Sequence, residues 1–342
     1  MTTTATPVLT KKDFQTDMEA RWCPGCGDYA ILSAVQSVFP ELGIPREKFV
    51  VVSGIGCSSR FPYYVNTFGF HTIHGRAPAV ATGIKITQPD LEVWVATGDG
   101  DSLAIGGNHT IHMLRRNVGI KVLMFNNRIY GLTKGQYSPT SEFGKKSKST
   151  PFGTVDRPFN PLALAIGSDA SFVARAVDVF QPQLKDTLKK AAAHKGSAYI
   201  EILQNCNIFN NGAWFDLTEK EVRSEHVVQL EDGKPLIYGK DRDKGIRLKG
   251  MEPEIVHLGN GNGLTEKDLL VHDEHHPDPS YAFILSQMED KPGFPTPIGV
   301  FRSWDRDRYE DLMSKQIKDI IAKRGAGNLT ELLHSGDTWE VR

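Results

Sequence analysis

The chain has little of what characterises membrane, secreted or nucleic-acid-binding proteins. It is 342 residues long and contains only four cysteines, too few for a fold held together by disulfides. Its 40 basic and 41 acidic side chains give a formal net charge of -1, which argues against a basic surface for nucleic acid or for lipid head groups. No apolar run approaches the roughly 20 residues that are needed to span a bilayer.

The first residues also lack the features of an export signal. Met1 to Asp13 is polar and rich in threonine, and no basic stretch there precedes an apolar one. We therefore expect a cytoplasmic protein whose thiols stay reduced. The cysteines, which are then candidates for a metal site, are Cys23, Cys26, Cys57 and Cys206.

Strand and helix patterns alternate over the first two-thirds of the chain. The expected strands are Phe49 to Ser53, Leu91 to Thr97, Ile120 to Phe125, Ser171 to Ala174 and Ala198 to Leu203. The expected helices between them are Ala30 to Phe39, Ala79 to Thr87, Ser102 to Arg115 and Leu184 to His194. This alternation predicts an α/β fold, with a mostly parallel sheet covered by helices on both faces.

The remainder of the chain is less regular. Residues 136–161 form a long polar stretch with little periodicity, and a loop of that length inside a domain is usually functional or disordered. After residue 206 the alternation weakens, although helices are expected near Tyr281 to Met288 and near Arg308 to Ala322. We predict an α/β domain over residues 1–206 and an irregular extension over residues 207–342 that packs on it.

Two polar turns follow neighbouring strands of the predicted sheet. Gly98-Asp99-Gly100 follows one strand, Asn126-Asn127 follows the next, and 25 residues separate the two turns. Right-handed crossovers bring the carboxyl ends of such strands together, at the edge where open α/β sheets bind ligands. The two glycines let the backbone approach phosphate groups.

The side chains of these turns suit Mg²⁺ bound to a diphosphate. Magnesium prefers a few hard protein oxygens together with phosphate oxygens. Asp99 offers a carboxylate, Asn127 an amide oxygen, and Ile129 a nearby backbone carbonyl. The pattern resembles the signature of thiamine-diphosphate enzymes, whereas a lone Gly-Asp-Gly would be a common strand–turn–helix sequence.

Three interpretations of the cysteines compete. Four thiolates could bind a structural zinc ion, although such sites commonly use two close Cys-x-x-Cys pairs and Cys57 and Cys206 are isolated. Cys23 and Cys26 alone could form a redox pair, which would leave the other two as buried thiols. A 4Fe–4S cluster would use all four, and beside thiamine diphosphate it could remove electrons one at a time.

Six segments together resemble one enzyme family. In chain order they are Arg21 to Gly27, Gly54 to Arg60, His74 to Ala77, Gly98 to Asp101, Asn126 to Gly131 and Thr133 to Gln136. They are similar to the beta subunit of 2-oxoacid:ferredoxin oxidoreductases, and most similar to the 2-oxoglutarate type. The similarity is dense from Met18 to Asn211 and loose beyond, and the combination is more specific than any single motif.

The resemblance implies a role for each matching residue. The 4Fe–4S cluster would be carried by Cys23, Cys26, Cys57 and Cys206. Mg²⁺ would be bound by Asp99, Asn127 and the carbonyl of Ile129. The cofactor would be lined by Ile55, Gly56, Cys57, Ser58, His74, Gly98, Gly100, Asp101, Gly131 and Leu132.

The resemblance also implies the reaction and the partners. It predicts oxidative decarboxylation of a 2-oxoacid, with the acyl group passing to coenzyme A and the electrons passing through the cluster to ferredoxin. We expect His74 to contact a reacting oxygen or a phosphate, and Lys134 to bind the distal carboxylate of 2-oxoglutarate. No acidic residue of this chain is an evident partner for the aminopyrimidine ring. A separate alpha subunit would supply it, in an αβ or α2β2 assembly.

Two alternatives come from other functional classes. A cluster-free thiamine-diphosphate decarboxylase or synthase would explain the two turns but not the cysteines. A zinc-stabilised assembly subunit without catalytic activity would explain the cysteines but not the turns. Iron, sulfide and zinc analysis, together with a titration of thiamine diphosphate, would separate these three possibilities.

Overall fold

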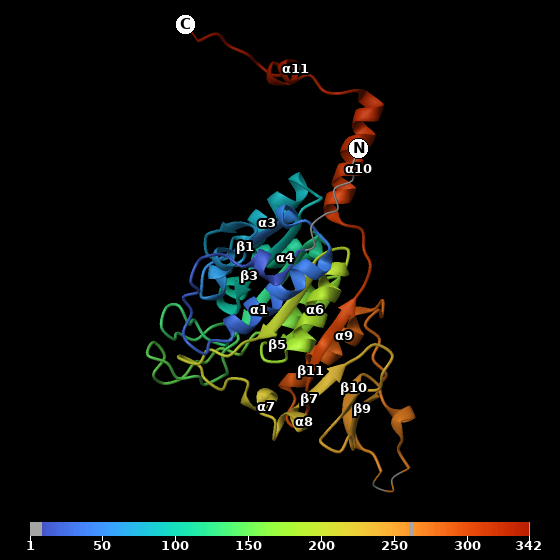
Figure 1. Cartoon of the computed structure of the whole chain (residues 1–342). Helices are drawn as coiled ribbons and strands as arrows, with labels where there is room; N and C mark the ends of the chain where they lie inside the picture. Colours follow the sequence, from blue (N-terminus) through green and yellow to red (C-terminus); the bar gives the residue numbers. More distant parts are fainter. Residues whose placement is uncertain (1–8, 260, 262, 342) are drawn as a thin grey trace.

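The computed structural model describes residues 9–259, 261 and 263–341, and an eight-stranded sheet forms the centre of its main body (Figure 1). Residues 1–8, which include most of the polar segment Met1 to Asp13, lie outside the described residues. In order across the sheet, the strands are β2 (Phe68–His71), β1 (Phe49–Ser53), β3 (Glu92–Gly98), β4 (Ile120–Asn126), β6 (Ala198–Leu203), β5 (Phe172–Val177), β11 (Thr296–Ser303) and β7 (Val227–Leu230).

The sheet is parallel except at one junction. Strands β2, β1, β3, β4, β6 and β5 all run in the same direction, and only β11 pairs antiparallel, with β5. The predicted mostly parallel sheet is therefore confirmed. The carboxyl ends of β1, β3, β4 and β6 lie at one edge, where the loops that follow them meet.

Helices cover both faces of the sheet, as predicted. The helices are α1 (Asp28–Val38), α2 (Phe61–Tyr64), α3 (Ala77–Thr87), α4 (Gly107–Arg115), α5 (Pro161–Gly167), α6 (Gln181–Ala193), α7 (Phe215–Thr218), α8 (Arg223–His226), α9 (Pro279–Ser286), α10 (Tyr309–Arg324) and α11 (Leu329–Leu333). α1 and α6 pack together on one face. α3, α4, α5 and α9 belong to the other. Among the described residues, no helix combines the length and apolar character that crossing a bilayer requires.

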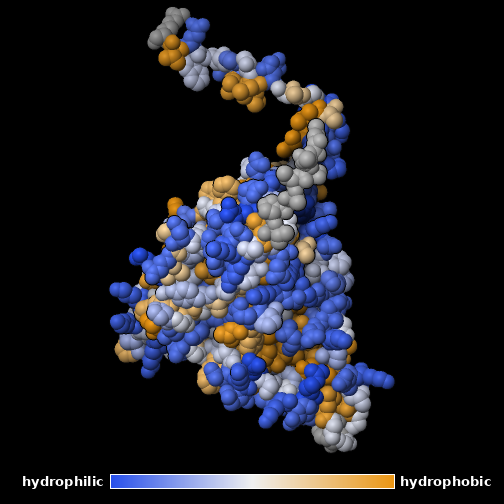
Figure 2. All heavy atoms as spheres, in the orientation of Figure 1, coloured by the Kyte–Doolittle hydropathy of each residue, from blue (hydrophilic) through white to orange (hydrophobic). Residues whose placement is uncertain are grey.

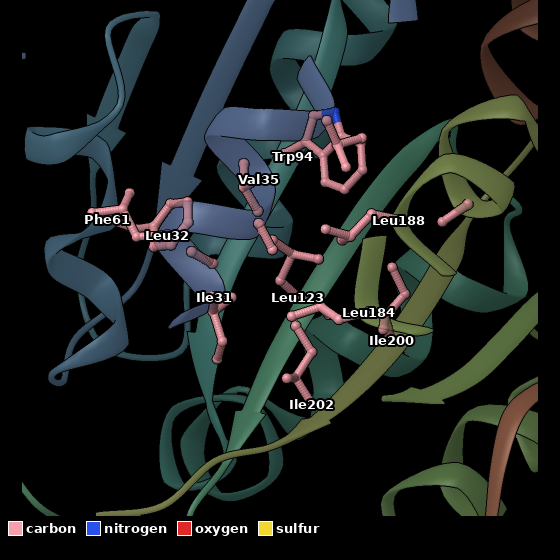
Figure 3. Close-up of a cluster of buried hydrophobic side chains, with 14 of the residues drawn as sticks. Ile31, Leu32, Val35, Phe61, Trp94, Leu123, Leu184, Leu188, Ile200 and Ile202 are labelled. Atoms are coloured by element: carbon pink, nitrogen blue, oxygen red, sulfur yellow. The ribbon is translucent and has the colours of Figure 1, made fainter. Parts of the chain in front are cut away.

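Alternate side chains of the central strands enter two separate cores. Trp94, Leu123 and Ile200 point toward α1 and α6, where they meet leucines of α6 (Figure 3). Their strand neighbours, such as Val95 and Val122, enter the core on the other face. Because both faces of the strands are covered, the strands are apolar at almost every position, and only a few charged residues lie within them.

Part of the chain after residue 206 joins the main sheet. β7 and β11 both belong to it, whereas β8 (Ile237–Tyr238), β9 (Lys244–Lys249) and β10 (Glu252–His257) form a small antiparallel sheet. α10 and α11 project from the body as an arm (Figure 1), and Figure 2 shows hydrophobic residues along this arm. The helix expected over residues 102–115 is interrupted, since a π-helical turn, Asp101–Ile105, precedes α4.

Candidate active site

The two predicted turns lie side by side at the carboxyl edge of the sheet. β3 pairs with β4, and the last residue of β3, Gly98, lies opposite Phe125. Asp99 therefore stands next to the end of β4, where Asn126 and Asn127 begin the second turn. The expected adjacency of these two strand ends is confirmed.

Asp99 is a buried carboxylate whose Oδ2 atom is held by two hydroxyl groups. Ser138 and Thr140 lie with their hydroxyl oxygens 2.5 and 2.6 Å from this atom. Burial has the largest effect on the pKa of Asp99 and raises it, while these two hydrogen bonds oppose the rise. The Thr140 hydroxyl is also 2.8 Å from Oδ1 of Asn126, so the polar loop 136–161 bridges the two turns.

The asparagine pair has two different environments. Asn126 is buried, donates from Nδ2 to Oε1 of Glu201 at 2.6 Å, and accepts from the Trp214 indole on its backbone oxygen at 3.1 Å. Asn127 is partly exposed, and its Oδ1 accepts from the Ile129 amide at 3.2 Å. Asn127 also donates from Nδ2 to Oε1 of Gln204 at 2.9 Å, so both side chains are anchored, and Asn127 is the one that is partly exposed at the site.

Asp101 connects three segments of the site. Its Oδ1 accepts from the Ile55 amide at 3.0 Å and the Gly75 amide at 2.7 Å. The same oxygen lies 2.5 Å from Nδ1 of His74. There is no room for a side chain beside this carboxylate, since a Cβ on Gly54 would lie 1.9 Å from its Oδ2. Asp101 thus fixes the loops that follow β1 and β2 against the loop that follows β3.

His74 lines a large cavity beside these loops. Because Nδ1 faces Asp101, Nε2 lies on the opposite side of the ring. The cavity has a volume of about 940 Å³ and is also lined by Tyr130, Thr133, Gln136 and Ser138. That volume is in the range of cavities that bind cofactors and drug-sized ligands, which is about 300–1,000 Å³. Tyr130 donates its hydroxyl to the Gly100 carbonyl at 3.1 Å, and its ring occupies the place of a Gly100 side chain.

The four cysteines line a second cavity, of about 200 Å³. Cys23 and Cys26 lie on one turn, closed by a hydrogen bond from the Cys26 amide to the Cys23 carbonyl at 3.0 Å. A Cβ on Gly131 would lie 3.6 Å from Sγ of Cys57 and 3.5 Å from Sγ of Cys206. The absence of a side chain at Gly131 therefore keeps the space between these two thiols open.

The groups around the thiols are buried, and not all of their hydrogen-bonding atoms have partners in the protein. Burial raises the pKa of the Cys57 thiol to about 12 and lifts the pKa of Cys26 as well. Asp28, on the same cavity wall, is buried with the Cys26 thiol as its neighbour, and burial raises its pKa to about 7 although the interaction with Cys26 opposes the rise. Buried polar groups normally have partners, so the protein alone leaves this cavity incomplete.

The cysteines are not arranged around a single metal ion. Within the part of the chain that the structure describes, no three His, Cys, Asp or Glu side chains are close enough to hold one ion. Four thiolates on one zinc ion each lie about 2.3 Å from it. In a four-iron cluster each thiolate binds a different iron, so the sulfur atoms stand further apart.

Comparisons with known proteins identify the domain and the family. Residues 54–202 match the family model for the C-terminal TPP binding domain of thiamine pyrophosphate enzymes. The chain is 50% identical over 332 residues to 2-oxoglutarate oxidoreductase subunit KorB of Mycobacterium tuberculosis, covering 96% of this chain and 88% of that protein. It is 45% identical over 251 residues to 2-oxoglutarate synthase subunit KorB of Methanocaldococcus jannaschii, covering 72% and 83% of the two chains.

A solved structure matches almost the whole chain. It is the 2-oxoglutarate:ferredoxin oxidoreductase of Magnetococcus marinus with 2-oxoglutarate, coenzyme A and succinyl-CoA bound. The TM-score is 0.75 at 32% identity, with 96% of this chain and 97% of that chain covered. This chain belongs to the family of 2-oxoacid:ferredoxin oxidoreductase beta subunits.

Membership of this family accounts for the thiamine-diphosphate domain. The matched residues 54–202 contain both predicted turns and the loop after β1. The residues expected to line the cofactor all lie at or just after the carboxyl ends of β1 to β4: Ile55, Gly56, Cys57, Ser58, His74, Gly98, Gly100, Asp101, Gly131 and Leu132. The fold therefore brings together the positions that the family resemblance selects, and their roles stay predictions.

Lys134 lies in a different place from His74. It lines the cysteine cavity, together with Asn127 and Gly131, whereas its neighbours Thr133 and Gln136 line the larger cavity. Its φ of 78° is in the left-handed region, which residues other than glycine rarely adopt. Such an outlier near a ligand site suggests a functional reason for its position.

Sequence reasoning missed a buried group of charged residues behind the site. Arg175 is fully buried, and its Nε lies 2.7 Å from Glu201 while its Nη2 lies 2.7 Å from Glu289. Arg175 and Glu201 are direct partners on the paired strands β5 and β6. Opposite charges within two otherwise apolar strands were the available signal. Ser138 and Thr140 carried no comparable signal, because they lie in an irregular loop.

Proposed function

We propose that this chain is the catalytic subunit of a 2-oxoacid:ferredoxin oxidoreductase that holds thiamine diphosphate, Mg²⁺ and a 4Fe–4S cluster. In this proposal the enzyme decarboxylates 2-oxoglutarate, or a related 2-oxoacid, to an acyl-CoA and CO₂, and ferredoxin accepts the electrons. One observation carries the proposal: Asn127 and Gly131, which follow β4, line the cavity of the four cysteines. The proposed diphosphate site and the proposed cluster site therefore share one loop.

The residues at the two strand ends fit a diphosphate with Mg²⁺. Asp99, Asn127 and the carbonyl of Ile129 offer three oxygen atoms of the kinds that Mg²⁺ prefers. A Cβ at Gly98 would lie 3.5 Å from the Ser58 hydroxyl, an ordinary contact, whereas the place of a Cβ at Gly100 is taken by the Tyr130 ring. Thiamine diphosphate would supply the capacity to stabilise negative charge on the former carbonyl carbon of the 2-oxoacid.

The cysteine cavity fits a cluster better than a single zinc ion. It brings Cys23, Cys26, Cys57 and Cys206 together without the close group of ligands that one ion needs. The buried carboxyl group of Asp28 and the open space at Gly131 support an occupant in this cavity. A cluster would supply one-electron transfer at this position.

Two side chains of this chain would act on the substrate. His74 is oriented by Asp101, so its Nε2 can hold or donate a proton at a reacting oxygen in the large cavity. Lys134 is exposed and places a cation beside the Asn127 loop, where it would attract the distal carboxylate of 2-oxoglutarate. The solved relative was captured with 2-oxoglutarate, coenzyme A and succinyl-CoA, which supports these substrates.

The site needs a second subunit in this proposal. In this proposal Asp99 and Asp101 are assigned to the metal and to His74, and the third acidic residue of the site, Asp156, lies on the irregular loop 136–161 at the wall of the large cavity. An alpha subunit would provide the carboxylate for the aminopyrimidine ring and would close the large cavity. The relatives are named as subunits, which supports this assembly.

The test is anaerobic purification of the chain together with its alpha subunit. We expect about four irons and four acid-labile sulfides per chain, and reduction of a one-electron dye that requires both coenzyme A and a 2-oxoacid. Iron-free active protein would instead indicate a cluster-free thiamine enzyme. Zinc without thiamine diphosphate binding would indicate an assembly subunit.

Lys134→Ala tests substrate selection in the same preparation. We expect kcat/KM for 2-oxoglutarate to fall at least tenfold and kcat/KM for pyruvate to change little, because pyruvate has no distal carboxylate. Lys134→Arg, which keeps the cation, serves as the matched control. Equal losses on both substrates would remove Lys134 as a selector.

A further inference from the structure

A third cavity lies apart from both cavities of the proposed active site. It has a volume of about 570 Å³, and its lining comes from the start of α6, from α8, β7, β11 and β8, and from the turn after β8. α8, β7 and the small sheet lie together at the end of the body away from α10 (Figure 1). None of the described residues that line it also lines the large cavity or the cysteine cavity. A molecule bound here is therefore neither the 2-oxoacid nor a cofactor of the proposed reaction.

Two arginines give this cavity a positive charge. Arg223 and Arg242 line it, and the lining that the structure describes contains no acidic residue. Neither guanidinium group has an ion-pair partner in the described part of the chain, and the nearby carboxylate of Glu225 is paired with Lys244 instead. Guanidinium groups bind phosphate through two parallel hydrogen bonds and keep their charge at any physiological pH. The cavity therefore offers an unneutralised charge that suits a phosphate-bearing ligand.

The turn that carries Arg242 is strained and held in place. Arg242 lies in the hairpin turn between β8 and β9 and has a φ of 53°, a left-handed conformation that glycine or asparagine usually adopts. The Gly239 amide donates to the Ser224 carbonyl at 2.8 Å, which joins this turn to the segment of Arg223. Both arginines are thus placed before a ligand binds. Strained residues cluster at ligand clamps, so the strain at a long charged side chain supports a binding role.

Apolar side chains form much of the remaining wall. Val227 and Ile298 lie on adjacent strands of the main sheet, and Ile237 lies on β8. The Phe180 ring also lines the cavity, with the Arg223 guanidinium 5.2 Å from the ring centroid. An inorganic anion would leave these walls in water, whereas a purely apolar molecule would leave the arginines without partners. A ligand with a flat apolar part and a phosphate group suits both, and the volume is within the range of about 300–1,000 Å³ for small-molecule sites.

We propose that this cavity binds a nucleoside phosphate. The two guanidinium groups hold the phosphate oxygens, and the base packs against Phe180 and the aliphatic side chains. The site goes beyond the proposed function and does not depend on it, because the cavity is separate from the thiamine-diphosphate turns and from the cysteines. Coenzyme A also contains a nucleoside phosphate, so free nucleotide and coenzyme A are separate arms of the test.

Calorimetric titration of ATP into the complex of this chain with its alpha subunit, with thiamine diphosphate and Mg²⁺ present, tests the proposal. We expect one saturable site per chain, and Arg223→Gln and Arg242→Gln should each raise Kd roughly tenfold, because each removes a charged contact to phosphate. Adenosine and pyrophosphate should each bind at least about tenfold more weakly than ATP, because each fills one part of the site. ATP should also slow amide hydrogen exchange over residues 179–183, at the cavity wall, and do so less in Arg242→Gln at the same concentration.

Arg247→Gln is the matched control, because Arg247 lies on β9 of the same small sheet but pairs with Glu254 at 2.9 Å and does not line the cavity. It should leave Kd for ATP within about a factor of two, and the melting temperature of each variant checks that it is folded. Absence of ATP binding, or equal losses in Arg247→Gln and Arg242→Gln, would overturn the proposal. Displacement of ATP by coenzyme A, or a raised KM for coenzyme A in Arg223→Gln, would overturn it too, because the cavity would then belong to coenzyme A.

Discussion

Replacing Glu201 with glutamine tests whether the buried charges behind the sheet edge hold the cofactor turn in place. Glu201 uses one oxygen for Arg175, at 2.7 Å, and the other for Asn126, at 2.6 Å. Both partners donate hydrogen bonds, so a carboxylate satisfies both, whereas a glutamine amide can accept only one of them. In Glu201→Gln, an NH₂ group therefore faces either Arg175 or Asn126, and one of these two hydrogen bonds is lost.

The expected magnitudes follow from this geometry. A hydrogen bond to a charged group contributes about 1.5–3 kcal/mol, so the melting temperature of a chain of this length should fall by roughly 2–4 °C. If Asn126 loses this contact, the turn that carries Asn127 loses one restraint, while Asn127 keeps its hydrogen bonds to Gln204 and to the Ile129 amide. Changes to groups that orient metal ligands weaken metal affinity by about 10–100-fold, and we expect the lower end, because Asn126 lies one residue from the proposed ligand. Calorimetric titration of thiamine diphosphate at fixed Mg²⁺ measures this loss directly.

Glu289→Gln provides the matched control for Glu201→Gln. Glu289 pairs with the same arginine at 2.7 Å, but Glu201 separates it from the asparagine turn. We expect this variant to change the melting temperature and to leave the affinity for thiamine diphosphate within a factor of two. The reasoning is refuted if the two variants weaken cofactor binding equally, or if Glu201→Gln leaves that binding unchanged.

Two further predictions concern stability. Burial raises the pKa of Glu289 to about 6 against the attraction of Arg175, so the folded chain binds a proton more tightly than the unfolded chain does. The free energy of unfolding of the unmodified protein, relative to that of Glu289→Gln, should therefore decrease as pH rises from about 4.5 to about 6. Urea unfolding of both proteins measures this difference, and an increase over that pH range would contradict the prediction. Gly54→Ala should destabilise the protein by about 2–4 kcal/mol, because the added Cβ would displace the Asp101 carboxylate. Gly83→Ala is the control: a Cβ at this position in α3 meets open space, so the change should stabilise the protein by up to about 1 kcal/mol. Equal effects of the two alanines in thermal melting would show that the Asp101 contact is not critical.

The parts of the site that lie on regular elements were predictable from sequence. The turns at Asp99 and Asn127 follow strands that are almost wholly apolar, and parallel strands deliver such turns to a common edge. The spacing of the residues was therefore enough to predict that the turns at Asp99 and Asn127 lie close together. Loop 136–161 has no period to follow, so the hydroxyls of Ser138 and Thr140 beside Asp99 were not predicted.

The interrupted helix after β3 has a local cause. The expected helix begins at residue 102, but Asp101–Ile105 is a π-helical turn and α4 starts at Gly107. The Asp101 side chain accepts hydrogen bonds from the loops after β1 and β2, which fixes its direction. A π-turn near a functional site is a common departure from α-helical geometry, and its position depends on contacts that helix propensity does not include.

The C-terminal half of the chain shows why the domain boundary is hard to read from sequence. β11 pairs antiparallel with β5, at the point where the parallel part of the sheet would otherwise end in an open edge. The short segment before β11 carries Glu289, the second carboxylate of the buried Arg175. A chain without this segment and β11 would leave Arg175 with one carboxylate partner and β5 with an unpaired edge. The division at residue 206 therefore separates regular from irregular sequence, while the sheet and its buried charges extend across it.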